Sequence, residues 1–256
     1  MSDYRLKYCK VNEPAEGKKQ FFAISDIHGH LAEFKLLLTA WNPNEQTLVL
    51  LGDYVDRGLN SKDVLDEIIK LKEQYKDKVI VLLGNHDEAL IDTIIDYEKS
   101  PFHVDLSITD SSTLYQIVDS NNVSKYVEFI RSMKLYHQYG KLLFTHAGYN
   151  TQISDWRNTS KYDFLWIRGH YCNSNKFDLI NIFGHTPGIT IPGHRRPEIM
   201  TEHNGFIAID GGVFSNGRLN GIVIDEEGTL LDYYYARDFN IHELNLAARN
   251  TFEFKD

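Results

Sequence analysis

The chain has 256 residues, 42% of them hydrophobic, and a formal net charge of −9 without a basic patch, which argues against nucleic acid as a partner. No apolar run approaches the roughly 18 residues that a membrane-spanning helix needs, and the polar N-terminus lacks the apolar centre of a signal peptide. Only Cys9 and Cys172 are present, which excludes a disulfide framework and a thiolate metal cluster, so we expect a cytoplasmic protein.

Five short apolar runs predict strands, at residues 21–24, 48–51, 79–83, 142–144 and 180–183. Each run is continuous rather than alternating, as expected for strands that are covered on both faces. Each run ends in a polar turn that carries Asp, His or Asn: SDIHGH, GDYVDRG, GNHDE, THAG and GHTPG. Because ligands bind at the carboxyl ends of strands in open α/β sheets, this recurrence predicts a site built from strand exits.

Helical stripes of apolar residues separate the first three runs. One stripe begins at Leu31 and ends at Trp41, and a second covers residues 64–69, with Asn60 or Ser61 as its cap. This alternation of strand and helix indicates βαβ units.

The rest of the chain changes character toward its C-terminal third. Residues 88–138 are expected to form helices, with a polar loop near residues 107–112. Further strands are expected at residues 206–209, 221–224 and 229–235, with a hairpin turn at 225–228. Because no repeat or linker interrupts the sequence, we expect one domain over residues 1–256.

The strand exits combine hard oxygen donors with imidazoles and carry no thiolates. In chain order the donors are Asp26, His28, Asp53, Asn85, His146 and His185. This mixture suits manganese, iron or zinc rather than calcium. Six donors are too many for one tetrahedral catalytic ion, but they suffice for two ions if one carboxylate is shared. Two ions roughly 3.5–4 Å apart form the clamp used for in-line displacement at phosphorus.

These blocks resemble the phosphoprotein phosphatase branch of the calcineurin-like metallophosphoesterases. The matching blocks, in the family's order, are DIHG at 26–29, GDYVDRG at 52–58, GNHDE at 84–88, HAG at 146–148 and GHT at 184–186. The resemblance implies an α/β fold, a metallophosphoesterase sandwich of mixed β-sheets packed with flanking helices. Its metal-binding core would cover about residues 20–212, and a C-terminal β-hairpin about residues 219–236. The short chain resembles bacterial or phage-type members, which implies no regulatory subunit.

The resemblance also implies how the metal ions are held. Two ions, manganese first with iron or zinc as alternatives, would hold a water or hydroxide as the nucleophile between them. Asp26 and His28 would bind the first ion, and Asp53 would bridge both. The second ion would be completed by Asn85, His146 and His185.

The remaining motif residues are implied to handle the proton and the phosphate. His86 would be the general acid, and Asp56 would hold its orientation. Arg57 matches the family's phosphate-binding arginine. Arg168, in the segment FLWIRGH, is the best match for a second one. Less favoured candidates for that second arginine are Arg157, Arg195 and Arg196.

Three functions remain open. The first is a phosphomonoesterase, a serine/threonine protein phosphatase acting on a phosphorylated protein or a small phosphoester. The second is hydrolysis of dinucleoside polyphosphates such as diadenosine tetraphosphate. The symmetrical hydrolases of this kind typically lack an acid at the Asp56 position, so Asp56 favours the first function, although some small bacterial members are assigned to asymmetrical dinucleotide hydrolysis. The third is a catalytically silent binding module, which we would expect to have lost the acid or a ligand.

Overall fold

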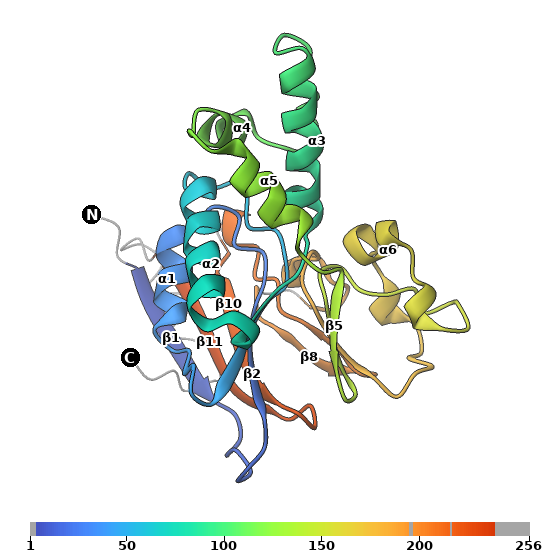
Figure 1. The fold of residues 1–256 in the computed structure, drawn as a ribbon. Helices are drawn as coiled ribbons and strands as arrows, with labels where there is room; N and C mark the ends of the chain where they lie inside the picture. Colours follow the sequence, from blue (N-terminus) through green and yellow to red (C-terminus); the bar gives the residue numbers. More distant parts are fainter. Residues whose placement is uncertain (1–3, 195–196, 216, 239–256) are drawn as a thin grey trace.

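Two mixed β-sheets pack face to face, and helices cover their outer sides (Figure 1). The computed structural model describes residues 4–194, 197–215 and 217–238. This architecture confirms the predicted α/β sandwich of mixed sheets with flanking helices.

The first sheet contains six strands in the order β1-β11-β10-β2-β3-β4. Their bounds are β1 Tyr4–Lys10, β2 Gln20–Ile24, β3 Gln46–Leu50, β4 Val79–Val81, β10 Leu219–Asp225 and β11 Leu230–Asp238. Strands β2, β3 and β4 run parallel, and the other neighbouring pairs are antiparallel. Every residue of β3 is buried, as its continuous apolar run predicts.

The second sheet contains five strands in the order β5-β6-β7-β9-β8. Their bounds are β5 Tyr136–Tyr139, β6 Leu142–Thr145, β7 Ile180–Phe183, β8 Met200–His203 and β9 Phe206–Ala208. Strand β7 lies parallel to both β6 and β9, so the carboxyl ends of these three strands share one edge of the sheet.

Six α-helices are found in the described residues. Their bounds are α1 Leu31–Leu38, α2 Ser61–Tyr75, α3 Asn85–Lys99, α4 Ser111–Val118, α5 Val123–Arg131 and α6 Lys161–Trp166. Short 3₁₀ turns are η1 Lys76–Lys78, η2 Trp156–Asn158, η3 His170–Cys172, η4 Gly188–Thr190 and η5 Val213–Ser215. Across the described ranges, no helix has the length and apolarity needed to cross a membrane.

Apolar side chains from both sheets fill the space between them. Phe21 of the first sheet and Phe144 of the second are both fully buried, with ring centroids 5.3 Å apart. The outer face of the first sheet packs against helices α1 to α5, and that of the second packs against η2 and α6. Burying both faces of each sheet fixes how the two sheets sit, and therefore where their strand ends meet.

The five predicted strands, the helical stripes and the C-terminal hairpin are confirmed. The expectation of helix up to residue 138 is wrong, because Tyr136–Tyr139 forms the edge strand β5. Strands β1 and β8 were not predicted. Strand β1 lies at a sheet edge and pairs only with β11, more than two hundred residues away, so its local pattern is weak. The expectation of one domain over residues 1–256 stays a prediction.

Candidate metal centre and active site

Strand exits from both sheets meet at one pocket of about 540 Å³. The pocket is lined by eight of the predicted residues: Asp26, His28, Asp53, Arg57, Asn85, His86, Arg168 and His185. Two further predicted residues lie directly behind its wall, because His146 contacts Asn85 at 2.9 Å and Asp56 contacts His86 at 2.7 Å. The structure therefore brings together all ten residues that the sequence singles out.

The backbone of the site is strained in a consistent way. Eight described residues other than glycine have a positive φ, and only Lys76 and Asn204 among them lie outside the site. The six that belong to the site are Asp26, His28, Asp53, Asp56, Arg57 and His185. The left-handed region costs an L-residue about 1–2 kcal/mol, so the surrounding structure must hold these turns in place. Such outliers cluster where side chains are aimed at a ligand.

Two glycines allow the strand exits to approach each other closely. A Cβ atom at Gly84 would collide with the backbone nitrogen and the carboxylate of Asp53. A Cβ atom at Gly184 would collide with the side chains of Ser25 and Asp26. Gly184 follows β7 and meets the residues after β2, so this contact joins the two sheets. Glycine is needed at both positions because the turns pack too closely for a side chain.

Two histidines are oriented by backbone carbonyls. The Nδ1 atom of His28 donates to the carbonyl of Val55 at 2.8 Å, and that of His146 donates to the carbonyl of Leu51 at 3.0 Å. This bonding leaves each Nε2 atom with its lone pair, the arrangement found in metal-binding histidines. Both Nε2 atoms face Asp53, at 3.5 Å for His28 and 3.4 Å for His146.

The donor atoms form two clusters that share one carboxylate. His28, Asp53 and His86 make one cluster, and Asp53, His146 and His185 make the other, with atoms in each lying within 4.8 Å of one another. The Nε2 atom of His185 is buried and has no hydrogen-bond partner among the described residues. A buried nitrogen without a partner is costly unless a ligand takes it up, so this set fits a pair of cations of the type that accepts mixed oxygen and imidazole donors.

Asp26 lies beside these clusters rather than in them. Both of its carboxylate oxygens accept the backbone N–H of His185 at 3.0 Å, and the hydroxyl of Ser25 donates to one of them. Its position between the two sheets ties the exit of β2 to the exit of β7.

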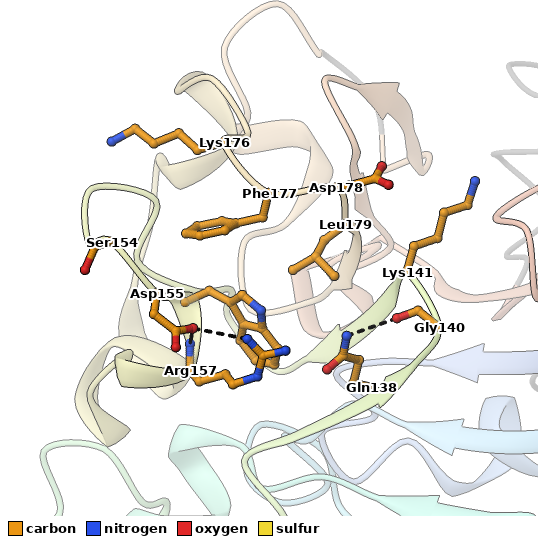
Figure 2. A pocket seen from close by; sticks show the side chains of 11 residues that line it. Gln138, Gly140, Lys141, Ser154, Asp155, Arg157, Lys176, Phe177, Asp178 and Leu179 are labelled. Atoms are coloured by element: carbon orange, nitrogen blue, oxygen red, sulfur yellow. Dashed lines mark hydrogen bonds and ion pairs between the residues drawn. The ribbon is translucent and has the colours of Figure 1, made fainter.

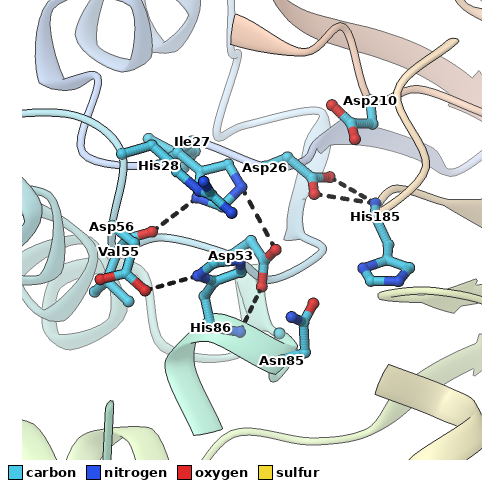
Figure 3. A network of polar contacts seen from close by, with 12 residues as sticks. Asp26, Ile27, His28, Asp53, Val55, Asp56, Asn85, His86, His185 and Asp210 are labelled. Carbon is cyan, nitrogen blue, oxygen red and sulfur yellow. Dashed lines mark hydrogen bonds and ion pairs between the residues drawn. The ribbon is translucent and has the colours of Figure 1, made fainter. Parts of the chain in front are cut away.

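Asp210 is a further buried carboxylate at the site, and the sequence reasoning missed it (Figure 3). It follows β9 in the stretch IDGG, so the signal was the same as at the other exits: an apolar run that ends in an acid and a glycine. Burial raises the pKa of Asp210 to about 7, and the charge of Asp53 is a smaller cause of the same increase.

Burial disfavours the charged forms of most titratable side chains at the site. Burial, followed by the charges of Asp210 and Asp53, raises the pKa of Asp26 well above its usual value. Burial also lowers the pKa of His28 to about 4. Burial opposes the ionised form of Asp53 too, but the neighbouring histidines led by His146 outweigh it and lower the pKa of Asp53. Clustered carboxylates among neutral imidazoles are what bound cations would compensate.

His86 and Asp56 form the closest ion pair of the site, at 2.7 Å between Nδ1 and Oδ2. Burial would lower the pKa of His86, but the hydrogen bond to Asp56 and the charges of Asp53 and Asp56 outweigh it and raise that pKa. The imidazole is therefore held in its protonated form more strongly than a free histidine.

Two arginines reach the same pocket. Arg168 donates from Nη1 to the carbonyl of His185 at 2.9 Å and to the hydroxyl of Thr186 at 3.2 Å, which fixes its guanidinium at the wall. Arg57 is exposed, with its guanidinium carbon 5.2 Å from the ring centroid of Phe214. Both arginines therefore line the pocket that holds the donor clusters.

A larger depression, of about 750 Å³, lies elsewhere (Figure 2). Lys141 and Leu179, which line it, precede β6 and β7, so it sits at the opposite end of these strands from the pocket. Arg157 belongs to this depression, where it pairs with Asp155 at 3.3 Å. That location disfavours Arg157 as the second phosphate-binding arginine, and the other two alternatives, Arg195 and Arg196, lie outside the described residues.

Comparisons with known proteins agree with this geometry. The family model for calcineurin-like phosphoesterases matches residues 19–212. A symmetrical bis(5'-nucleosyl)-tetraphosphatase of Nitrosospira multiformis is 30% identical over 129 residues, which are 50% of this chain and 42% of that protein. An asymmetrical bis(5'-nucleosyl)-tetraphosphatase of Anoxybacillus flavithermus is 24% identical over 234 residues, which are 81% of this chain and 91% of that protein. The chain spans less than half the length of the symmetrical hydrolases that it matches.

Among solved structures, the fold is similar to that of a protein serine/threonine phosphatase from Saccharomyces cerevisiae. The TM-score is 0.59 with 13% sequence identity, and the match covers 88% of this chain and 82% of that one. At this identity the likeness concerns the fold alone.

Proposed function

The chain belongs to the calcineurin-like phosphoesterase family, and we propose that it is a metal-dependent phosphomonoesterase, a serine/threonine protein phosphatase of the bacterial or phage type. The observation that carries this proposal is the buried pair of His86 and Asp56, 2.7 Å apart, in which His86 also lies close to His28 and Asp53. A phosphoserine or phosphothreonine ester releases an alkoxide, a strong base that needs a proton as it departs. An imidazole held in its protonated form supplies that proton.

The proposed metal ligands are the six donors named from the sequence. In this proposal Asp26 and His28 would hold one cation, Asn85, His146 and His185 would hold the other, and Asp53 would contribute to both. When bound, the cations would neutralise charge on a phosphoryl group and lower the pKa of a water molecule. Manganese is the proposed metal, with iron and zinc as alternatives that the same donors accept.

The other residues of the pocket move the proton and hold the phosphate. Because Asp56 takes up Nδ1 of His86, Nε2 is the atom that can donate to the ester oxygen. The carboxylate of Asp56 stabilises the imidazolium before transfer and fixes the plane of the ring. Arg57 and Arg168 bind phosphoryl oxygens from the pocket wall, where their planar forks can form paired hydrogen bonds.

Hydrolysis of a dinucleoside tetraphosphate is the second candidate. It is favoured by the relative from Anoxybacillus flavithermus, named as an asymmetrical hydrolase, which matches over 81% of this chain. A nucleotide phosphate is a weaker base than an alkoxide and departs more readily without a proton. This second function therefore makes less use of a well-held general acid, which is why we rank it below the first.

A direct comparison of two substrates tests the proposal. We would measure kcat/KM of the Mn²⁺-loaded protein on a phosphothreonine peptide and on diadenosine tetraphosphate, with the products of the dinucleotide separated by chromatography. The proposal predicts a higher kcat/KM on the peptide. A preference for the dinucleotide by orders of magnitude would overturn it in favour of the second candidate.

A third substrate guards against a false negative with the chosen peptide. p-Nitrophenyl phosphate has a small, good leaving group that makes few demands on the shape of the pocket. If the metal-loaded protein hydrolyses none of the three compounds, the chain is better described as a silent binding module on this fold.

A further inference from the structure

The loop before α4 is fastened to the His86–Asp56 pair by two reciprocal hydrogen bonds. The backbone N–H of Asp110 donates to Oδ1 of Asp56 at 3.0 Å, and the backbone N–H of Arg57 donates to Oδ2 of Asp110. Oδ2 of Asp56 is taken up by His86. Both oxygens of the fully buried Asp56 carboxylate are therefore committed, one to the imidazole and one to the loop that begins α4.

Asp110 does not use its side chain in the usual way for its position. It is the N-cap residue of α4, where an aspartate commonly accepts a hydrogen bond from the first turn of its own helix. No side-chain cap bond is formed here, and the carboxylate accepts the N–H of Arg57 instead. The helix therefore forgoes a stabilising contact while the turn that carries Asp56 and Arg57 gains one.

Side chains of α4 also contact the start of α2. The hydroxyl of Ser61 accepts the backbone N–H of Asp56 at 3.0 Å and contacts the hydroxyl of Thr113 at 2.9 Å. The backbone N–H of Lys62 donates to the side-chain oxygen of Gln116 at 3.2 Å. These contacts fix the register of α4, so Asp110 is presented to the turn by a rigid element.

The turn needs such support because its backbone is strained. Asp56 and Arg57 both have a φ of 69°, and consecutive non-glycine residues in the left-handed region are unfavourable without outside contacts. We infer that Asp110 is a positioning residue for the proposed reaction, one that aims Asp56 at His86 and Arg57 at the pocket from helix α4. This inference rests on the proposed function for its catalytic consequence, but the contacts stand independently of it.

The consequence can be measured through the leaving group. A general acid matters most when the departing oxygen is a strong base, and least when it is a weak one. Loosening Asp56 should therefore slow the hydrolysis of an alkyl phosphate more than that of p-nitrophenyl phosphate. A merely structural role of Asp110 would slow both to the same extent.

The experiment compares three variants of the full chain loaded with Mn²⁺. In Asp110→Ala we expect kcat on a phosphothreonine peptide to fall about 10-fold more than kcat on p-nitrophenyl phosphate, the equivalent of one lost hydrogen bond. Asp110→Asn keeps a side-chain oxygen for the N–H of Arg57 and should restore most of the difference. Asp119→Ala, at the exposed C-terminal end of the same helix, should behave as the wild type. Metal content is measured for each and should not change.

A second measurement does not depend on turnover. The free energies of unfolding of Asp110→Ala, Asp56→Ala and the double variant should be non-additive, because the two residues share one hydrogen-bonded ring. Equal losses of kcat on both esters, or no rescue by asparagine, would overturn the inference. If the wild type hydrolyses neither ester, the proposed function fails, and additive unfolding energies would then overturn the inference separately.

Discussion

The Nδ1 atom of His86 lies 2.7 Å from Oδ2 of Asp56, although the two residues leave different strands and are 30 positions apart. His86 is in the first turn of α3, and Asp56 is in the turn that follows β3. Strands β3 and β4 lie side by side and parallel, so their exits present these two side chains to each other. The pair sits beside Asp53, which is common to both donor clusters.

Replacement of the imidazole should remove proton donation while sparing the metal centre. For His86→Asn we expect kcat on an alkyl phosphate to fall by about 10² to 10⁴, the usual contribution of a general acid. Steady-state kinetics on a phosphothreonine peptide checks the rate, and elemental analysis of the purified variant checks the bound metal. A parallel loss of metal and activity would show that His86 is a ligand or a structural residue instead.

Addition of metal should stabilise the folded chain. A cation that binds only the folded state at 100 times its Kd stabilises it by about 2.7 kcal/mol. We therefore expect Mn²⁺ to raise the Tm, EDTA to reverse the increase, and Asp53→Asn to abolish it, since Asp53 belongs to both clusters. Asp119→Asn serves as the control, because it removes an exposed carboxylate far from the clusters. An equal increase in Tm for Asp53→Asn would mean that Mn²⁺ binds elsewhere.

Asp26→Asn should change stability in opposite directions with and without metal. Burial and the charges of Asp210 and Asp53 raise the pKa of Asp26, so its charged form destabilises the metal-free fold. The neutral amide should stabilise that fold by about 0.5–2 kcal/mol, as substitutions at strained functional sites commonly do. Mn²⁺ should stabilise the variant less than it stabilises the wild type, because one donor is lost. In Mn²⁺ the variant should therefore be the less stable of the two proteins. Urea unfolding in EDTA and in Mn²⁺ measures both quantities, and a variant that is less stable in both conditions would contradict the prediction.

His170 should make the fold sensitive to acid independently of the metal centre. It is 1% exposed, among Tyr149, Phe183 and Phe206, and burial lowers its pKa to about 3. Below the ordinary histidine pKa the unfolded chain binds a proton that the folded chain does not, so His170 stabilises the fold less as the pH falls.

The variant His170→Phe isolates this effect, since the other histidines are common to both proteins. Between pH 7 and pH 5 the difference in unfolding free energy should move by about 2 kcal/mol in favour of the variant. Equilibrium unfolding in EDTA at the two pH values checks this shift. A difference that does not depend on pH would mean that His170 is protonated in the folded state or is not buried.

Much of the candidate site follows from local sequence patterns. An apolar run that ends in a glycine-containing turn with Asp, His or Asn identifies a strand exit, and the structure brings all five such exits to one place. Asp210 carries the same signal, because an acid followed by glycine comes after the short strand Phe206–Ala208. The edge strand β1 gave a weak signal because its pairing partner is β11, at the other end of the described chain.

Other features depend on contacts that no local pattern reports. Arg168 and Arg157 both lie near aromatic residues in the sequence, so the sequence does not separate them. The packing of η2 and α6 brings Arg168 to the pocket and leaves Arg157 in the other depression. No motif in the sequence marks Asp110, and its bond to Arg57 arises because α4 docks on α2.

The sequence by itself determined the five strands that end in the motifs, the order of the motifs and the chemical type of each donor, because these depend on residue identity and on short-range periodicity. The tertiary structure alone decided that exits from two separate sheets share one pocket, that Asp53 lies between two groups of histidines, and that the loop before α4 bonds to the His86–Asp56 pair. These outcomes come from burying apolar faces between sheets and helices, which sets distances between residues far apart in the chain.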